Sequence, residues 1–194
     1  MLVLGIDPGT RHLGWGIVQR TGNRLTAIAH GVISPEPSLS LSERLVVIEH
    51  GLVDVIDRFR PDSAAVESLF FHKDAQAAAK LGHARGVVLL VLARASISIA
   101  EYAPAKVKRI IAGGGAAEKR QVALMMKALL GLSELPRADA TDALALAVTH
   151  LRLGPLAKLQ ASTTSASTTS LHKGPSPRER LRKLAALARE RRKG

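Results

Sequence analysis

Residues 1–10 read MLVLGIDPGT and place an aspartate, Asp7, at the end of an apolar run that is typical of a buried β-strand. A carboxylate on such a strand is costly to bury unless a cation neutralises it. Further along the chain, SAAVES at residues 63–68 is a second short apolar run, and it carries Glu67. If the two strands pair side by side, the two carboxylates can face one another. The two runs together therefore predict a cation site.

A helical stretch near the end of the apolar sequence supplies two more carboxylates. ADATDALALAVTH at residues 138–150 is rich in alanine and leucine, and it opens with Asp139 and Asp142. Positions three apart lie on one side of a helix, so both acids can reach the same point. Oxygen donors of this kind suit Mg²⁺ or Mn²⁺. Two such ions about 4 Å apart can activate water and stabilise a leaving oxygen, so the pattern predicts metal-dependent phosphoryl chemistry.

Each of these acids also has an ordinary structural explanation. Asp139 can be a helix N-cap, and Asp142 can interact favourably with the helix dipole in the first turn. Asp7 precedes Pro-Gly and can be a turn former, while Glu67 can be a paired surface acid. The combination of all of them on buried strands and one helix favours a shared site over unrelated roles.

The order of the apolar patterns predicts an α/β fold with a central mixed sheet. Three hairpin-linked strands come first, and a helix, a strand, a helix and a strand follow. This order is the ribonuclease H-like arrangement, in which helices flank a five-stranded sheet. The expected strands are residues 2–7, 14–19, 24–33, 63–67 and 96–100, and the expected helices are residues 40–59, 74–94, 104–112, 118–130 and 137–153.

A change of composition after residue 154 predicts a domain boundary. Residues 1–154 have the apolar content of one domain, whereas residues 155–194 contain the low-complexity run QASTTSASTTS. This second part is expected to be a Ser/Thr linker and a basic tail, disordered or partly helical. The chain has a net charge of +12, and the tail, with ten Lys or Arg and two Glu, accounts for +8. That charge suits a polyanion such as nucleic acid, and a solvated tail explains it equally well.

The rest of the composition excludes several classes of protein. With no cysteine, the chain has no disulfides, thiolate nucleophiles or cysteine zinc sites. The apolar runs are short and interrupted, so no transmembrane helix is expected. The N-terminus enters a strand directly, so no secretory signal is expected. A cytoplasmic protein without a membrane association is the simplest expectation.

Several other residues are candidates for DNA contacts. Lys108 and Lys119 belong to a basic patch, and lysine binds phosphate as a point charge. Arg85 can contact the DNA backbone, with an ion pair on a helix surface as an equal alternative. Phe70 and Phe71 stand out in a chain with only three phenylalanines, one tryptophan and one tyrosine. An exposed ring at Phe70 suits base stacking, whereas one of the two rings can instead be core, and the role of Phe71 stays open.

The order and spacing of several motifs resemble those of the RuvC family of Holliday junction resolvases, over residues 1 to about 152. The resemblance implies an endonuclease that nicks two strands of like polarity symmetrically in a four-way DNA junction, during recombination and repair. It also implies a homodimer with two-fold symmetry and collaboration with the RuvA–RuvB branch-migration complex. The matching segments are GIDPGTRHLGWG at 5–16, AVESLFF at 65–71, LGHARG at 81–86, AEKRQV at 117–122 and ADATDALALAVTH at 138–150.

The resemblance also assigns roles to single residues. It implies that the acids bind two metal ions, that an aromatic ring unstacks bases at the junction, and that two lysines lie near the scissile phosphate. The acids concerned are Asp7, Glu67, Asp139 and Asp142, the ring is Phe70, and the lysines are Lys108 and Lys119.

Three other functions compete with this interpretation. One is a YqgF-like nuclease of the ribonuclease H-like group that acts on RNA, although the segments at 81–86 and 138–150 favour RuvC. Another is a DNA-binding module without catalysis, which only the basic tail supports. The third is an ATPase of the actin/Hsp70 type, suggested by GIDPGT at 5–10. That fold needs a duplicated domain and a second phosphate loop, and the chain shows neither.

Overall fold

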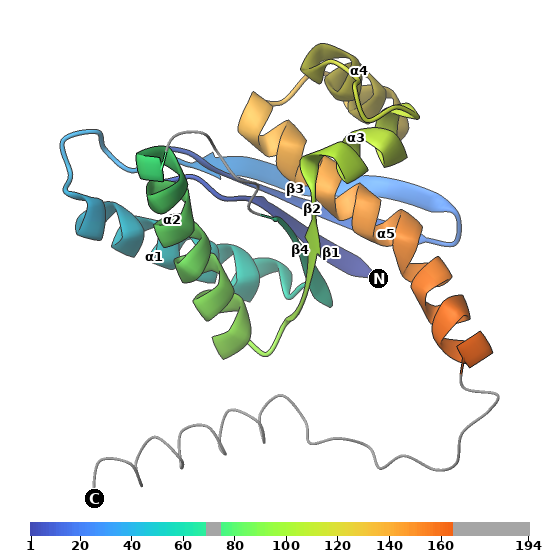
Figure 1. Cartoon of the computed structure of the whole chain (residues 1–194), viewed down its shortest axis with the longest axis horizontal. Helices are drawn as coiled ribbons and strands as arrows, with labels where there is room; N and C mark the ends of the chain where they lie inside the picture. The colour runs from blue at the N-terminus through green and yellow to red at the C-terminus, as the bar shows by residue number, and fades with distance from the viewer. Residues whose placement is uncertain (69–74, 165–194) are drawn as a thin grey trace, which may run out of the picture. The chain divides into compact units, whose positions relative to one another are not determined.

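A five-stranded mixed sheet forms the centre of the protein, with strand order β3-β2-β1-β4-β5 (Figure 1). The computed structural model describes residues 1–68 and 75–164, and of residues 75–77 and 155–164 only the backbone. β1 pairs antiparallel with β2 and parallel with β4. The strands are β1 Leu2–Asp7, β2 Leu13–Thr21, β3 Arg24–Ile33, β4 Ser63–Glu67 and β5 Ser98–Tyr102.

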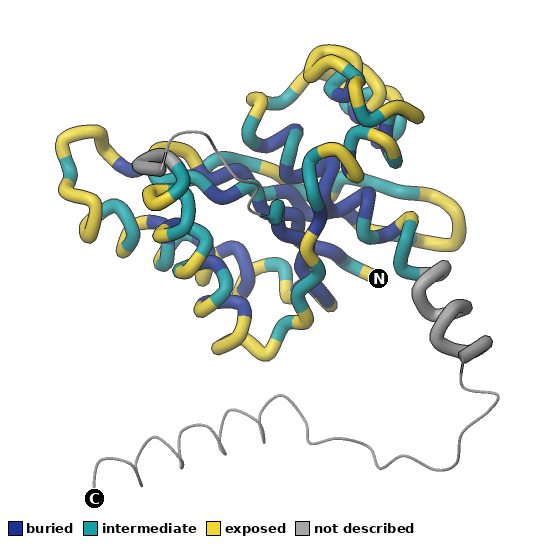
Figure 2. Tube along the Cα trace, in the orientation of Figure 1, coloured by how far each residue is buried: buried dark blue, intermediate teal, exposed yellow. Residues whose placement is uncertain are grey.

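Helices cover both faces of this sheet (Figure 1). One apolar cluster joins the sheet to α1 and α2, and a second joins its other face to α3, α4 and α5. Figure 2 shows these buried segments along the sheet and the inner sides of the helices. The predicted architecture is therefore confirmed. The helices are α1 Leu41–Phe59, α2 Ala75–Arg94, α3 Pro104–Ala112, α4 Lys119–Leu130 and α5 Ala138–Thr164.

The first helix shows how local sequence sets an element boundary. Ser40 is the N-cap of α1, and its hydroxyl accepts a hydrogen bond from the Glu43 N–H while the Glu43 carboxylate accepts one from the Ser40 N–H. This reciprocal capping satisfies two N–H groups that a helix start leaves without partners. None of the helices in the described ranges is long and apolar enough to cross a bilayer.

The expected fifth strand at residues 96–100 is wrong by two positions, because β5 begins at Ser98. Ser96 has a φ of 58° in the left-handed region, and its N–H donates to the Ala93 carbonyl while the Ile97 N–H donates to Leu92. These bonds close the end of α2. The backbone can become extended only after these hydrogen bonds. The strand therefore starts later than expected, and it ends at Tyr102.

The last helix continues beyond residue 153, where the sequence predicted its end, and reaches Thr164. Pro155 lies within it and has no N–H, so the Leu151 carbonyl lacks its usual helical donor. Nη1 of Arg20, from β2, donates to that oxygen at 2.7 Å. A side chain from the sheet thus satisfies the carbonyl that proline leaves unpaired. Residues Met1–Ala157 form one compact unit, and the predicted boundary after residue 154 stays a prediction.

Glycines in β1 and β2 let α5 lie very close to the sheet. A Cβ atom built on Gly5 would lie 1.8 Å from the carbonyl oxygen of Ala143, and one on Gly14 would lie 2.0 Å from that of Asp139. No side chain fits at such distances. The glycines therefore fix the height at which the acidic end of α5 sits above β1 and β2.

We expect Gly5→Ala to lower the free energy of unfolding by about 1–3 kcal/mol, the usual cost of overpacking, because the new methyl group meets helix backbone rather than a movable side chain. Gly82→Ala in α2 is the matched control. A Cβ there meets nothing within 4 Å, so this variant should gain about 0.5–1 kcal/mol from helix propensity. Urea unfolding measures both. An unchanged midpoint for Gly5→Ala would contradict the close contact.

Candidate active site

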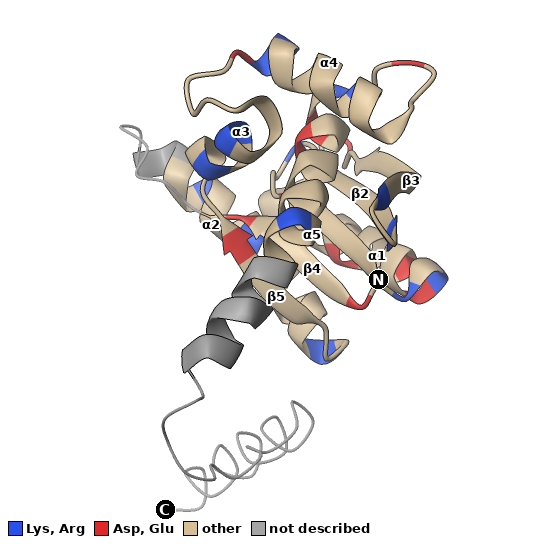
Figure 3. Cartoon of the chain, turned by 90° about the vertical axis from the view of Figure 1, so that its right-hand side faces the viewer, with Lys and Arg blue, Asp and Glu red and all other residues tan. Residues whose placement is uncertain are grey.

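A pocket of about 290 Å³ brings the separated candidate residues together. It lies where β1 and β4 end, and α2, α3, α4 and α5 supply the rest of its wall. Figure 3 shows lysine and arginine on α3 and α4, two of the helices that line the pocket. The lining residues are Asp7, Pro8, Glu67, Leu81, Pro104, Val107, Lys108, Lys119, Val122, Asp142, Ala145 and Leu146.

The sheet geometry explains why Asp7 and Glu67 share this pocket. β1 and β4 are adjacent and parallel, so their carboxyl ends lie at the same edge. Side chains alternate between the two faces of a strand. Val3 of β1 and Ala65 of β4 belong to the apolar cluster that contains α5, and Asp7 and Glu67 follow them at even spacing. Both carboxylates therefore lie on the α5 side, where Asp142 reaches the pocket from the helix.

Asp139 lies beside the pocket rather than in its wall. Its carboxylate is 3.8 Å from Nη2 of Arg137, and its negative charge still acts on Asp7. Within residues 1–68 and 75–164, no group of three or more Asp, Glu or His side chains is spaced as metal ligands would be. The structure thus brings Asp7, Glu67 and Asp142 to one pocket and leaves Asp139 at its margin.

Asp7 has the most perturbed carboxyl group in the pocket. Burial is the largest cause, and it raises the pKa of Asp7 from 3.8 to about 8. The carboxylates of Glu67, Asp142 and Asp139 add smaller effects in the same direction, in that order, whereas Lys119 lowers the pKa. Negative charge is therefore concentrated at this point of the fold, and a bound cation would relieve it.

Lys119 forms an ion pair with Asp142, one of these acids. Its Nζ lies 3.4 Å from Oδ2 of Asp142, and its side chain is 79% exposed. The charge of Asp142 is the main cause that raises the pKa of Lys119, so the amine stays protonated at neutral pH. An ion pair that is this exposed to solvent adds little to the stability of the fold. Its place in the pocket instead suits a phosphate ligand, and Lys108 of α3 lines the same pocket.

Comparison with known proteins identifies the family. The family model described as "Crossover junction endodeoxyribonuclease RuvC" matches residues 3–150. The chain belongs to the RuvC family. A curated RuvC of Sorangium cellulosum is 63% identical over 151 residues, which are 78% of this chain and 84% of that protein. One of Rhodopseudomonas palustris is 51% identical over 148 residues, covering 76% and 85%.

The solved structures agree with this assignment. The structure described as "T. thermophilus RuvC in complex with Holliday junction substrate" superposes with a TM-score of 0.77 at 39% identity, covering 81% of this chain and 96% of that one. The ribonuclease H-like fold and the endodeoxyribonuclease class expected from the sequence are confirmed. These relatives favour the RuvC function over a YqgF-like RNA nuclease or a DNA-binding module without catalysis.

Arg85, another candidate DNA contact of this RuvC family member, does not line the pocket. Arg85 forms an ion pair with Glu101 of β5, and its side chain is only 12% exposed, which matches the ion-pair alternative that the sequence left open. Its contact with DNA stays a prediction. Phe70 and Phe71 lie outside the described residues, so the roles considered for them stay predictions too.

Sequence reasoning missed the apolar part of the pocket wall. Leu81, Pro104, Val107, Val122 and Leu146 line it beside the charged residues. A signal was present in the chain, since Pro104 begins α3 and sets that helix at the end of β5. Apolar side chains therefore share the pocket with Asp7, whose burial is the main cause that raises its pKa.

The raised pKa of Asp7 predicts how stability depends on pH when no divalent cation is present. The folded protein holds a proton that the unfolded chain releases near 3.8, so this group's contribution to stability is complete below that pH. It is lost as the pH rises toward the folded value of about 8. The Asp7→Asn variant has no carboxyl group at this position, so its stability should not fall with pH for this reason.

Urea unfolding of both proteins with a chelator present tests this expectation. The stability of Asp7→Asn relative to wild type should increase steadily between about pH 4 and pH 8. Adding Mg²⁺ at pH 8 should stabilise the wild type and leave the variant almost unchanged. A difference that stays constant with pH would mean that Asp7 ionises normally in the folded state.

Proposed function

We propose that this pocket hydrolyses phosphodiester bonds at Holliday junctions and that two copies of the chain nick two strands of like polarity. The observation that carries the proposal is that Asp7, Glu67 and Asp142 share one pocket with Lys108 and Lys119. Carboxylates from separate elements beside phosphate-binding lysines suit phosphoryl transfer. The junction as substrate rests on the Thermus relative, whose structure contains a Holliday junction.

The carboxylates suit divalent metal ions. Asp7, Glu67, Asp139 and Asp142 offer only oxygen donors, which Mg²⁺ and Mn²⁺ prefer. We propose that these four acids hold two ions, with Asp139 moving in from the margin of the pocket. The bound ions would make water a stronger nucleophile and stabilise charge on the leaving oxygen. Burial and, to a smaller extent, the neighbouring carboxylates raise the pKa of Asp7, and a bound cation would offset both effects.

The reaction needs no covalent intermediate with the protein. Water attacks the phosphorus, a new phosphorus–oxygen bond forms, and the bond to the 3′-oxygen breaks, leaving a 5′-phosphate and a 3′-hydroxyl. Water's proton passes to solvent, and the 3′-oxygen takes up a proton. Lys119, protonated beside Asp142, stabilises the negative charge that grows on the phosphate in the transition state. Lys108 holds the adjacent backbone phosphate as a point charge.

Several further features complete the proposal. A homodimer with two-fold symmetry would present two such pockets to the junction. Phe70 would stack against an unpaired base at the crossover. The RuvA–RuvB complex is the proposed partner for branch migration. We place the protein in the cytoplasm, since its relatives are bacterial enzymes that act on DNA.

Cleavage of a synthetic four-way junction by the purified full chain tests this function. We expect nicks on two opposing strands that require Mg²⁺ or Mn²⁺, and little cleavage of a linear duplex of the same sequence. An RNA duplex and a single strand serve as competing substrates. Preferred cleavage of RNA would favour the YqgF-like alternative. Tight binding to the junction without any cleavage in either metal would favour a binding module.

A further inference from the structure

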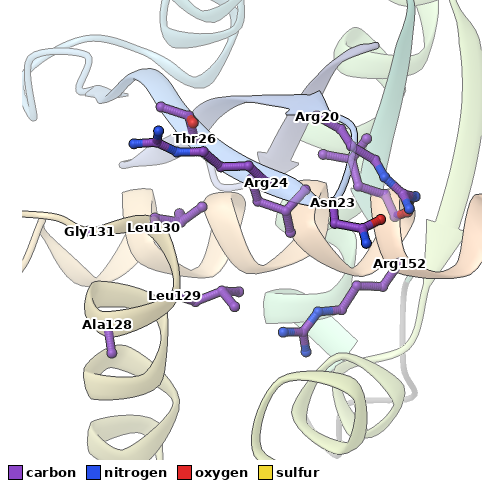
Figure 4. Close-up of a pocket in the computed structure, with 11 residues that line it drawn as sticks. Arg20, Asn23, Arg24, Thr26, Ala128, Leu129, Leu130, Gly131 and Arg152 are labelled. Carbon is purple, nitrogen blue, oxygen red and sulfur yellow. The ribbon is translucent and has the colours of Figure 1, made fainter.

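A second pocket, of about 490 Å³, lies away from the proposed active site. Figure 4 shows its side chains coming from the hairpin that joins β2 to β3 on one side, and from α4 and α5 on the other. It shares no lining residue with the pocket that contains Asp7. Nothing in the phosphodiester chemistry above uses it.

All the charged residues that line this pocket are arginines: Arg20, Arg24 and Arg152. Arg20 is held by bonds from Nη1 to the Leu151 carbonyl, at 2.7 Å, and from Nε to the Gly22 carbonyl, at 3.1 Å. Nη1 of Arg152 donates to the Ile110 carbonyl at 2.8 Å. Two guanidinium groups are thus fixed in place and still have unused N–H donors.

None of these arginines pairs with a carboxylate among the described side chains. Arg24 is exposed and lies at the start of β3. Arginine binds carboxylates through two parallel hydrogen bonds, and a fixed guanidinium loses little entropy when it does so. Arg20 and Arg152 therefore make a pre-organised pair for carboxylate groups, and Arg24 adds a third, exposed guanidinium group.

Four leucines also line the pocket: Leu25 and Leu129 are partly buried, and Leu130 and Leu151 belong to the core. A neighbouring pocket of about 330 Å³ adds Ile111 and Met125, and the two share Ala128, Leu129 and Arg152. Met125 is 40% exposed, and Leu124, on the same helix, is 51% exposed. An apolar surface therefore continues from the arginines along α4.

We propose that this surface binds an acidic peptide segment of another protein, with its carboxylates on the arginines and its apolar side chains on the leucines and Met125. Charge complementarity selects this occupant. The chain's own residues 155–194 carry +8 and would be repelled. A DNA backbone would satisfy the arginines but would leave the aliphatic lining without apolar partners. A peptide that alternates acidic and apolar residues satisfies both.

The position of the pocket lets a peptide and a junction bind together. α4 begins at Lys119, in the proposed active site, and ends at Leu130, in this pocket. A helix of 12 residues is about 18 Å long. The strand β1 also runs between the two sites. The backbone N–H of Arg20 donates to the carbonyl of Met1, just before β1 begins, whereas Asp7 is the last residue of that strand. A partner docked here would be tethered to the nuclease without covering its catalytic residues.

Fluorescence anisotropy with the full chain tests the proposal. The probe is a labelled synthetic peptide in which aspartate alternates with leucine and phenylalanine. The matched probe has serine and glycine in place of the apolar residues and keeps the same charge. We expect the first probe to bind at least about tenfold more tightly, and Arg24→Glu to weaken it about tenfold. Thermal melting confirms that the variants are folded.

Arg58→Glu is the control for net charge, because Arg58 is an exposed residue on α1, which covers the opposite face of the sheet. It should leave peptide affinity within about twofold of wild type. Excess four-way junction should not displace the probe. Equal binding of the two probes would reduce the pocket to a general anion site. Equal effects of Arg24→Glu and Arg58→Glu would also overturn the proposal, as would a loss of duplex affinity confined to Arg24→Glu with peptide binding unchanged.

Discussion

Asp7→Asn is expected to reduce junction cleavage about a thousandfold while the protein still binds the junction. Asparagine keeps the shape of the side chain and removes the negative charge that we propose holds metal. Metal stabilisation of a phosphoryl transition state contributes several kcal/mol, and about 1.4 kcal/mol corresponds to each tenfold change in rate. Binding without metal should be almost unchanged at neutral pH, because Asp7, with its pKa raised to about 8, then carries little negative charge that could repel the phosphates.

Single-turnover cleavage in Mg²⁺ and a gel-shift titration without metal measure the two quantities separately. Asp54→Asn removes an equal charge from an exposed position on α1 and should leave cleavage unchanged. Wild-type turnover by Asp7→Asn would remove this residue from the site. A parallel loss of binding and cleavage would instead assign Asp7 to DNA recognition or folding.

Lys119→Met should have the second largest effect, a loss of about 100- to 1000-fold in cleavage with little change in stability. Removing one preorganised donor from a developing oxyanion typically costs this much. The ion pair with Asp142 is 3.4 Å long and its lysine is 79% exposed, so its loss should barely shift the melting temperature. A structural lysine would behave in the opposite way.

Lys127→Met is the matched control, since Lys127 lies on the same helix but outside the pocket. It should retain almost full cleavage. Lys119→Arg should recover part of the activity, because the positive charge remains while the position of the donors changes. If Lys119 and Lys127 variants lost activity equally, general attraction of DNA to α4 would explain the effect.

The strands and most helices were predictable because each carries a strong local pattern. Residues 24–33 and 63–67 were expected as strands, and both have those bounds in the structure. Ser40 and Glu118, expected as first helical residues, are N-caps instead. The proximity of Asp7 and Glu67 was predictable too. If the two apolar strands pair side by side, both carboxylates can lie on the same face of the sheet.

The remaining features depend on contacts that no local pattern records. The start of β5 was misplaced because hydrogen bonds at the end of α2 extend that turn through Ser96. The end of α5 was misplaced because a proline usually ends a helix, and here Arg20 from a distant strand compensates for it. The arginine pocket was also invisible, because its residues come from β2, β3, α4 and α5.

The packing of α5 on Gly5 and Gly14 also has a consequence for synthesis, because it can form only after residues 138 onward have been made. Asp7 and Glu67 leave the ribosome early, whereas Lys119 and Asp142 come from elements made late in synthesis. Until α5 docks, one apolar face of the sheet is uncovered, and a nascent chain in that state is a substrate for chaperones rather than a nuclease. Truncated translation products that stop before residue 138 therefore lack part of the proposed active site, including Asp142.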